Sequence, residues 1–268
     1  MKILTTENIK SNLIEKLKTT NINKTLHILS KQPSKEVDAF KKFIIKRCEE
    51  FDITYNDKVF SDDFTNEEII TYINSFNNED AFILLQPFGE SKELNYLREN
   101  IKLKDIDGFT FDSLGKSMVG SLEGLPATPR AIISFLNEYN IDIKEKKIII
   151  ANNTNLIGLP LSSYCSKHRA YVTILNSAYP DPHQAIKNAD IFISAIGKAN
   201  YYGKEYFRDG QVLIDVGTSV VNGKIVGDIN YKELEYMDVR VLTSKKGIGA
   251  ITTLTLLSGL IDRERQCH

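Results

Sequence analysis

The sequence predicts an α/β protein with a mainly parallel sheet, because strand-like and helix-like segments alternate along it. The clearest unit spans residues 146–177 and opens with an unbroken apolar run at residues 148–151, which is typical of a strand buried on both faces. A polar loop, a segment from Gly158 with one apolar helical face, and a β-branched run at residues 171–175 complete strand, turn, helix and strand. This pattern fits half of a nucleotide-binding fold or a packed βαβ unit that binds nothing. Both interpretations stay open, since the unit has no G-x-G-x-x-G.

The composition excludes several classes of partner. The 34 Lys and Arg residues nearly balance the 35 Asp and Glu residues, so nothing electrostatic favours nucleic acid or an acidic membrane. No apolar run approaches the length of a bilayer span, and residues 1–17 have the pattern of a polar amphipathic helix, not a signal peptide. The 3 cysteines are Cys48, Cys165 and Cys267. Their wide spacing predicts reduced thiols in the cytoplasm, with no disulfide framework and no metal site.

The first half of the chain predicts alternating helices and strands. Helices are expected at residues 6–19, 35–51 and 66–76, and strands at residues 26–29, 53–60 and 81–85. Thr5 or Thr6 would cap the first helix. The two acids in the loop at residues 104–109 are residue types that commonly form turns.

The second half predicts a further set of parallel strands. Thr128 is expected as the N-cap of a helix that has Pro129 at its first position and runs to Tyr139, which places a domain boundary near residues 125–140. Strands are expected at residues 190–195, 211–216 and 239–242, and a last apolar helix begins at residue 251. Loops with Gly or Thr follow several of these strands, where open α/β sheets bind ligands, so a binding site is favoured over a bare scaffold.

Several short segments, in order and spacing, resemble the methylenetetrahydrofolate dehydrogenase/methenyltetrahydrofolate cyclohydrolase family of bifunctional folate enzymes. These segments are residues 105–109, 126–129, 157–160, 189–192, 214–217, 226–228 and 247–249. The resemblance implies an N-terminal folate-binding α/β domain at residues 1–125, joined by a C-terminal helix at residues 251–268. It also implies a Rossmann-like NAD(P)-binding domain at residues 126–250, a cleft between the two domains, and a homodimer formed through the Rossmann-like domain.

The family transfers a hydride from the methylene carbon of the folate to the nicotinamide and then hydrates the methenyl cation. The resemblance implies that this second step relies on a lysine one helical turn after a tyrosine. This sequence has Ile44 at the lysine position and Phe40 at the tyrosine position, and an isoleucine cannot transfer a proton. Lys41 could share that helix face and substitute, or it could be a solvated surface lysine.

The expected substrate site departs from the family at a second point. The family has a glutamine, one more residue and a proline where this chain has Leu85, Gln86 and Pro87. Either Gln86 substitutes for that glutamine, or the polar partner of the lysine is also absent. Asp107 matches the family aspartate that hydrogen-bonds the pterin ring, as a carboxylate can accept two N–H bonds. Ile251 and Thr252 are also expected beside the substrate.

The resemblance places a dinucleotide on the second domain but does not identify it. The family reads Gly-Arg-Ser where this chain has Asn152, Asn153 and Thr154; the arginine holds the 2′-phosphate of NADP, so neutral Asn153 weakens that preference. Ser177 matches a family serine near the same phosphate. No acid follows the second strand to bind a 2′-hydroxyl, so NADP and NAD both remain open. The remaining expected cofactor residues are Thr128, Gly158, Ala195, Gly197, Gly217, Thr218 and Gly249.

These observations leave three functional hypotheses. The first is a dehydrogenase that keeps hydride transfer and has lost or weakened the cyclohydrolase step, since the cofactor supplies the hydride chemistry. The second is a paralogue for another one-carbon or non-folate substrate, and the third is a non-catalytic binding protein. The first is favoured because the chain retains family residues at the expected sites, namely Asp107, Thr128, Gly158, Gly217 and Thr252.

Overall fold

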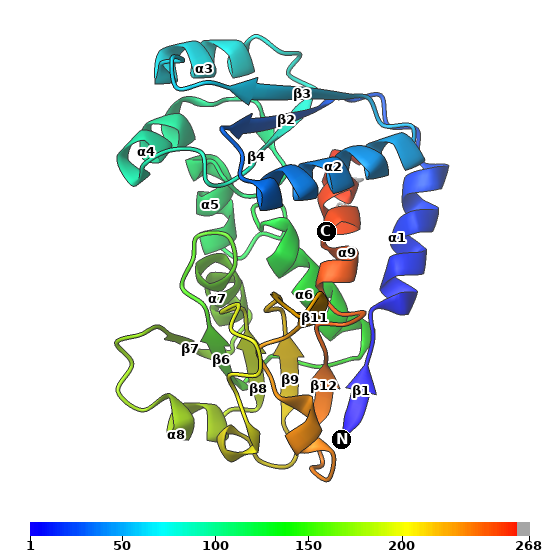
Figure 1. The fold of residues 1–268 in the computed structure, drawn as a ribbon, viewed down its shortest axis with the longest axis vertical. Helices are drawn as coiled ribbons and strands as arrows, with labels where there is room; N and C mark the ends of the chain where they lie inside the picture. The colour runs from blue at the N-terminus through cyan, green and yellow to red at the C-terminus, as the bar shows by residue number, and fades with distance from the viewer. Residues whose placement is uncertain (262–268) are drawn as a thin grey trace.

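The computed structural model describes residues 1–261 and has one parallel sheet in each half of the molecule (Figure 1). The helices are α1 Glu7–Thr19, α2 Lys35–Glu50, α3 Asn66–Asn74, α4 Ser91–Asn100, α5 Phe111–Met118, α6 Ala127–Glu138, α7 Gly158–Lys167, α8 Pro182–Lys187 and α9 Gly249–Leu257. The strands are β1 Lys2–Leu4, β2 Leu26–Lys31, β3 Tyr55–Phe60, β4 Ala81–Leu84, β5 Lys104–Asp105, β6 Lys147–Ala151, β7 Tyr171–Leu175, β8 Ile191–Ser194, β9 Val212–Asp215, β10 Ser219–Val221, β11 Lys224–Val226 and β12 Arg240–Leu242. The predicted α/β class with mainly parallel strands is confirmed.

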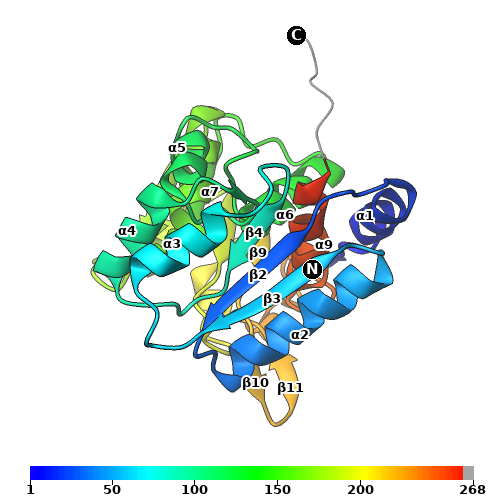
Figure 2. The same cartoon turned by 90° about the horizontal axis from the view of Figure 1, so that it is seen from above.

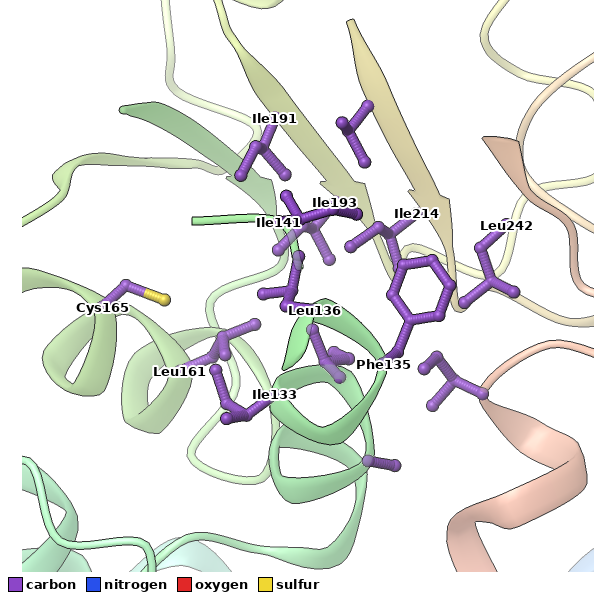
Figure 3. Packing of buried hydrophobic residues seen from close by; sticks show 14 of the residues in the cluster. Ile133, Phe135, Leu136, Ile141, Leu161, Cys165, Ile191, Ile193, Ile214 and Leu242 are labelled. Carbon is purple, nitrogen blue, oxygen red and sulfur yellow. The ribbon is translucent and has the colours of Figure 1, made fainter. Parts of the chain in front are cut away.

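A six-stranded parallel sheet forms the second half, in the order β1-β12-β9-β8-β6-β7. Every residue of β8 and β9 is buried, as expected for apolar strands covered on both faces. On one face, Phe135 and Leu136 of α6 pack with Ile193 and Ile214 of the sheet (Figure 3). This rigid centre fixes the positions of the loops that leave the carboxyl ends of the strands.

A four-stranded parallel sheet forms the first half, in the order β3-β2-β4-β5. Its two faces carry separate apolar clusters, one with α2 and α9 and the other with α3 and α4. Ile44 and Cys48 of α2 lie in the first cluster together with Ile28 of β2. Seen from above, α2 runs along one side of this sheet (Figure 2).

The start of the chain differs from the predicted helix. Residues Lys2–Leu4 form β1, which pairs in parallel with β12 at the edge of the six-stranded sheet, and the helix begins only at Glu7. Residues 2–4 therefore lie in the sheet of the second half, although the expected N-terminal domain began at residue 1. The boundary between residues 125 and 126 stays a prediction. Thr6 precedes α1, but its hydroxyl donates to the carbonyls of Lys246 and Gly247 and makes no cap bond.

The prediction that Thr128 caps the next helix is wrong. Helix α6 starts at Ala127, so Thr128 lies inside its first turn. The Oδ1 atom of Asp107 accepts a hydrogen bond from the backbone N–H of Ala127 at 3.0 Å. A carboxylate from a distant loop thus supplies the acceptor that a local Ser or Thr usually provides.

Helix α9 connects the two halves. It rises from the six-stranded sheet beside α1 and α6 towards the upper sheet (Figure 1), and its Leu254, Leu256 and Leu257 lie in the apolar cluster of the four-stranded sheet. A 3₁₀ turn at Ser258–Leu260 follows it, so the predicted helix from residue 251 begins earlier, at Gly249. The expected continuation over residues 262–268 lies outside the described residues. Among residues 1–261, no helix combines the length and apolarity that crossing a bilayer requires.

Candidate functional site

The carboxyl ends of β6, β8 and β9 bring together several of the residues expected to contact a cofactor. The backbone N–H of Ala195 donates to the carbonyl of Ala151 at 3.2 Å, and that of Gly217 donates to the carbonyl of Ser194 at 3.2 Å. The loops after these neighbouring strands therefore begin side by side. This edge of the sheet points towards the four-stranded half (Figure 1), and it is the edge at which open parallel sheets bind ligands.

Asn152 organises the loop between β6 and α7. Its Oδ1 accepts from the backbone N–H groups of Thr154 and Gly158 at 2.9 Å and 3.0 Å and from the Thr154 hydroxyl at 2.8 Å, while its Nδ2 donates to the Ala195 carbonyl at 2.8 Å. A Cβ at Gly158 would lie 1.8 Å from the Asn152 carbonyl oxygen, so only glycine fits there. The Asn152 side chain thus shapes the loop from within, whereas Asn153 is exposed.

Asn153 and Ser177 follow neighbouring strands. Ala151 pairs with Leu175 in the ladder between β6 and β7, and the two exposed residues come shortly after these strand ends. Both side chains are neutral, so neither provides an ionic contact for a phosphate.

Three further expected cofactor residues, Gly197, Thr218 and Gly249, lie at three loops of the same edge, whereas Thr128 lies on α6. Gly197 has φ of +67°, a conformation that favours glycine, and its carbonyl accepts from the Ser219 hydroxyl at 2.9 Å. Thr218 is exposed in the loop after β9, and Gly249 is exposed at the first residue of α9.

Asp107 lies where the loop after β5 meets α6. Burial raises its pKa to about 6, and neighbouring Asp105 adds to this rise; the hydrogen bond from Ala127 and the charge of Arg130 oppose it. Asp105 itself accepts from the backbone N–H groups of Asp107 and Thr110, at 2.9 Å and 2.7 Å. Asp105 therefore holds the loop, and Asp107 is an acid whose pKa is raised by burial.

The α2 residues expected at the substrate site diverge in exposure. Phe40 is 43% exposed, whereas Ile44 is 0% exposed and lies in the apolar cluster with Ile28 and Leu85. The alternative of a solvated surface lysine at Lys41 is wrong, because its side chain is buried. The Lys41 Nζ atom pairs with the carboxylate of Asp57 at 3.2 Å and with that of Asp38 at 3.4 Å.

Gln86 lies two residues after the end of β4, a strand made entirely of apolar residues. The backbone N–H of Leu85 donates to the Leu29 carbonyl at 2.8 Å, so Leu85 continues the ladder with β2. The Gln86 Nε2 atom is buried and has no hydrogen-bond partner among residues 1–261. An amide without a partner inside a protein is unfavourable unless a ligand or water satisfies it, which marks Gln86 as a possible contact for a polar ligand atom.

The two α9 residues expected beside the substrate are fully or partly buried. Ile251 is fully buried in the core of the second half with Leu242 and Ile248. Thr252 is partly buried, and its hydroxyl donates to the Ile248 carbonyl at 2.9 Å. Lys246, in the loop before α9, pairs with Glu7 at 2.7 Å.

The sequence reasoning did not single out two buried acids at the same sheet edge, Asp215 and Asp228, although both lie within the motifs that carried the family resemblance. Each is 0% exposed, and each accepts several hydrogen bonds from loops at this edge. The available signal for Asp215 was an acidic residue at the end of an otherwise apolar strand, and for Asp228 it was an acidic residue next to Gly227.

Comparison with known proteins identifies the fold and the family. Residues 126–268 match the family model described as the NAD(P)-binding domain of tetrahydrofolate dehydrogenase/cyclohydrolase. The chain is 34% identical over 255 residues to the bifunctional protein FolD of Clostridium botulinum strain Langeland, covering 93% of this chain and 90% of that relative. It is 30% identical over 262 residues to the FolD protein of Dictyoglomus turgidum, with coverage of 95% and 93%.

Solved structures agree. The bifunctional methylenetetrahydrofolate dehydrogenase/cyclohydrolase FolD of Campylobacter jejuni superposes with a TM-score of 0.88 at 25% identity, over 97% of each chain. The Trypanosoma brucei enzyme, solved with NADP and an inhibitor, has a TM-score of 0.83 at 19% identity, over 96% of this chain and 95% of that one, and shows the shared fold alone. The predicted resemblance and the predicted NAD(P) cofactor are thus confirmed, and the chain belongs to the tetrahydrofolate dehydrogenase/cyclohydrolase family, an enzyme family of one-carbon metabolism with a Rossmann-like NAD(P)-binding domain.

Proposed function

We propose that the protein is an NAD(P)-dependent methylenetetrahydrofolate dehydrogenase whose methenyltetrahydrofolate cyclohydrolase activity is lost or weak. One observation carries the proposal: the helix position that the family resemblance assigns to a catalytic lysine is Ile44, and its side chain lies wholly within an apolar cluster. In contrast, the loops at the carboxyl ends of β6, β8 and β9, where we expect the dinucleotide, retain several of the expected cofactor residues.

The residues at that edge suit a dinucleotide. Loops after three neighbouring strands meet there, and Gly197, which has no side chain, and Thr218 are exposed on two of these loops. When bound, the nicotinamide supplies the chemistry by accepting a hydride from the one-carbon unit of the substrate. The protein then needs mainly to align two carbons, so hydride transfer does not require a lysine.

The hydrolytic step is different, because water must be activated and protons moved. Such transfer needs a titratable group within hydrogen-bond reach of the reacting atoms. Ile44, Phe40 and Leu85 have no titratable group. Lys41 does not substitute for the missing lysine, since its ammonium is held by Asp57 and Asp38.

Asp107 remains suited to substrate binding. Its carboxylate uses Oδ1 for Ala127 and can accept further N–H bonds through its second oxygen. With a pKa of about 6, it is mainly charged at neutral pH, which favours hydrogen bonds from the N–H groups of a heterocycle. Gln86, with its unpaired Nε2, is the other polar group proposed to contact the substrate.

The proposal leaves NADP and NAD as candidate cofactors and includes a homodimer, the assembly that the family resemblance implies. Sedimentation of the purified protein would measure the assembly. For the activity, the purified protein is mixed with methylenetetrahydrofolate and either NADP or NAD, and the absorbance of the reduced nicotinamide is followed. Substrate-dependent reduction of one cofactor supports the proposal. Binding of a dinucleotide without turnover of this substrate would favour a paralogue with another substrate, and binding of neither ligand would contradict the enzyme assignment.

A further inference from the structure

We propose that Asp228 and Asp215 are positioning residues that hold the loops after β8, β9 and β12 in the shape that binds the dinucleotide. Neither needs to touch the cofactor to do so. The inference rests on the proposed function only in that the edge of the six-stranded sheet binds a dinucleotide.

Asp228 fixes the loop that follows β8. Its Oδ2 accepts from the Ser194 hydroxyl at 2.6 Å and from the backbone N–H of Ile196 at 2.8 Å, and its Oδ1 accepts from the backbone N–H of Lys198 at 2.8 Å. These donors bracket Gly197. The same carboxylate packs against the loop after β9, because a Cβ at Gly217 would lie 2.1 Å from it. One side chain therefore sets the distance between two cofactor loops.

Asp215 extends the arrangement to the third loop. Its two oxygens accept from the backbone N–H groups of Asp228 and Ile229, both at 3.1 Å. The Tyr231 hydroxyl donates to Oδ2 and in turn accepts from the backbone N–H of Ser244 at 3.1 Å. Ser244 lies in the loop between β12 and α9, so this chain of bonds links the start of the α9 loop to the segment that carries Asp228.

The backbone of the neighbouring loops packs closely against these acids, so a residue with a side chain does not fit at Gly227. A Cβ at Gly227 would lie 2.0 Å from Asp215 Oδ2 and 2.9 Å from the Ser244 hydroxyl. Burial raises the pKa of Asp215 to about 6, which shows that the site is unfavourable for a charge. Apolar residues would avoid that penalty, but they could not accept the N–H groups of irregular loops, which must be paired when buried. We therefore infer that these acids are present to fix the conformation of the loops, not to stabilise the core.

The test is direct binding of the reduced dinucleotide by the whole protein, measured through its fluorescence, together with steady-state kinetics. Asp228→Asn keeps one acceptor oxygen but turns an NH₂ group towards backbone donors, and we expect its dissociation constant to rise by about tenfold or more. The KM for the dinucleotide should rise similarly, with a smaller change in kcat at saturating cofactor. Tyr231→Phe removes the hydroxyl that links Asp215 to Ser244 and leaves the bonds of Asp228 in place, and a rise of about threefold is expected.

The matched control is Asp80→Asn, just before β4 of the other sheet. Asp80 also accepts a backbone N–H bond, from Thr25 at 2.8 Å, so this variant should lose stability without losing dinucleotide affinity. Equal loss of affinity in Asp80→Asn and Asp228→Asn, or unchanged affinity in Asp228→Asn, would overturn the inference. If Asp228→Asn does not fold, the test depends on Tyr231→Phe, and an unchanged dinucleotide affinity in that variant would overturn the inference. Binding is scored without folate, so a wild-type protein that binds the dinucleotide but lacks turnover contradicts the proposed function and not this inference.

Discussion

The carboxylate of Asp107 accepts a hydrogen bond from the backbone N–H of Ala127 at 3.0 Å. This contact joins the loop after β5 to the amino end of α6, where the helix dipole favours a negative charge. Burial acts in the opposite direction and raises the pKa of Asp107 to about 6. The folded protein thus keeps an acid where its charge is unfavourable, which is common for groups retained for binding or catalysis.

The first prediction concerns Asp107→Asn. The amide oxygen can still accept from Ala127, and the buried charge is gone, so the free energy of unfolding at pH 7.5 should increase by about 1–3 kcal/mol. Between about pH 4 and pH 6 the wild-type folded state binds more protons than the unfolded state, so its stability falls as pH rises through this window. The gain from the substitution should therefore vanish near pH 4 and be complete above pH 6. Thermal unfolding across this pH range measures it.

The same variant should lose activity. We expect kcat/KM for methylenetetrahydrofolate to fall by at least about tenfold, the effect of one lost charge-assisted hydrogen bond. Asp62→Asn, at a side chain that is 69% exposed, is the control and should change neither quantity. A less stable Asp107→Asn with full activity would show that the carboxylate serves the fold alone.

The second prediction is a gain of function. Ile44→Lys, combined with Phe40→Tyr and Leu85→Gln, should introduce hydrolysis of methenyltetrahydrofolate, because an amine in an apolar site can exist unprotonated near neutral pH. Burying the amine should lower the free energy of unfolding by about 3 kcal/mol. Ile44→Met in the same background is the control, since it changes the shape without adding an amine. Equal hydrolysis by both variants would show that the position plays no part in proton transfer.

The third prediction tests whether Lys41 acts in catalysis. Lys41→Met removes the partner of Asp57 and Asp38, which are partly exposed, so stability should fall by about 1–2 kcal/mol. Dehydrogenase kcat/KM should remain within about twofold of wild type, as expected for a change away from the reacting atoms. Selective loss of a hydrolytic activity, with reduction of the dinucleotide intact, would instead assign a catalytic role to Lys41.

The fourth prediction concerns cofactor choice. Asn153→Arg would place a guanidinium on the exposed loop after β6, and Arg binds phosphate through paired hydrogen bonds. The KM for NADP should fall by about tenfold relative to that for NAD. Asn155→Arg, in the same exposed loop, is the control for a general charge effect. A similar shift in both variants would argue against a specific 2′-phosphate contact at residue 153.

The sequence predicted most of the elements whose apolar pattern is long and regular, including α2 and the strands β6 to β9. It missed β1 because three residues carry too little periodicity, and their pairing with β12 joins the two ends of the chain. It also missed α4, α5 and the β10–β11 hairpin, whose exposed faces weaken the apolar signal.

The contacts of the site residues were also only partly predictable from the sequence. Helical spacing put Lys41 on a plausible face of α2, but only the fold shows that Asp57 on β3 lies opposite it. Thr128 had the residue type of an N-cap, whereas the cap comes from Asp107, about twenty residues earlier in the sequence. Contacts between distant segments decide both cases, and one sequence does not contain them.

The central claim is that no group at the Ile44 site transfers a proton to or from water. The most direct measurement supplies methenyltetrahydrofolate to the purified protein and compares its rate of hydrolysis with the rate in buffer alone. We predict little or no acceleration by the protein, although it reduces NADP or NAD with methylenetetrahydrofolate and accumulates the methenyl product. Hydrolysis that is fast, saturable and proportional to protein concentration would contradict the account.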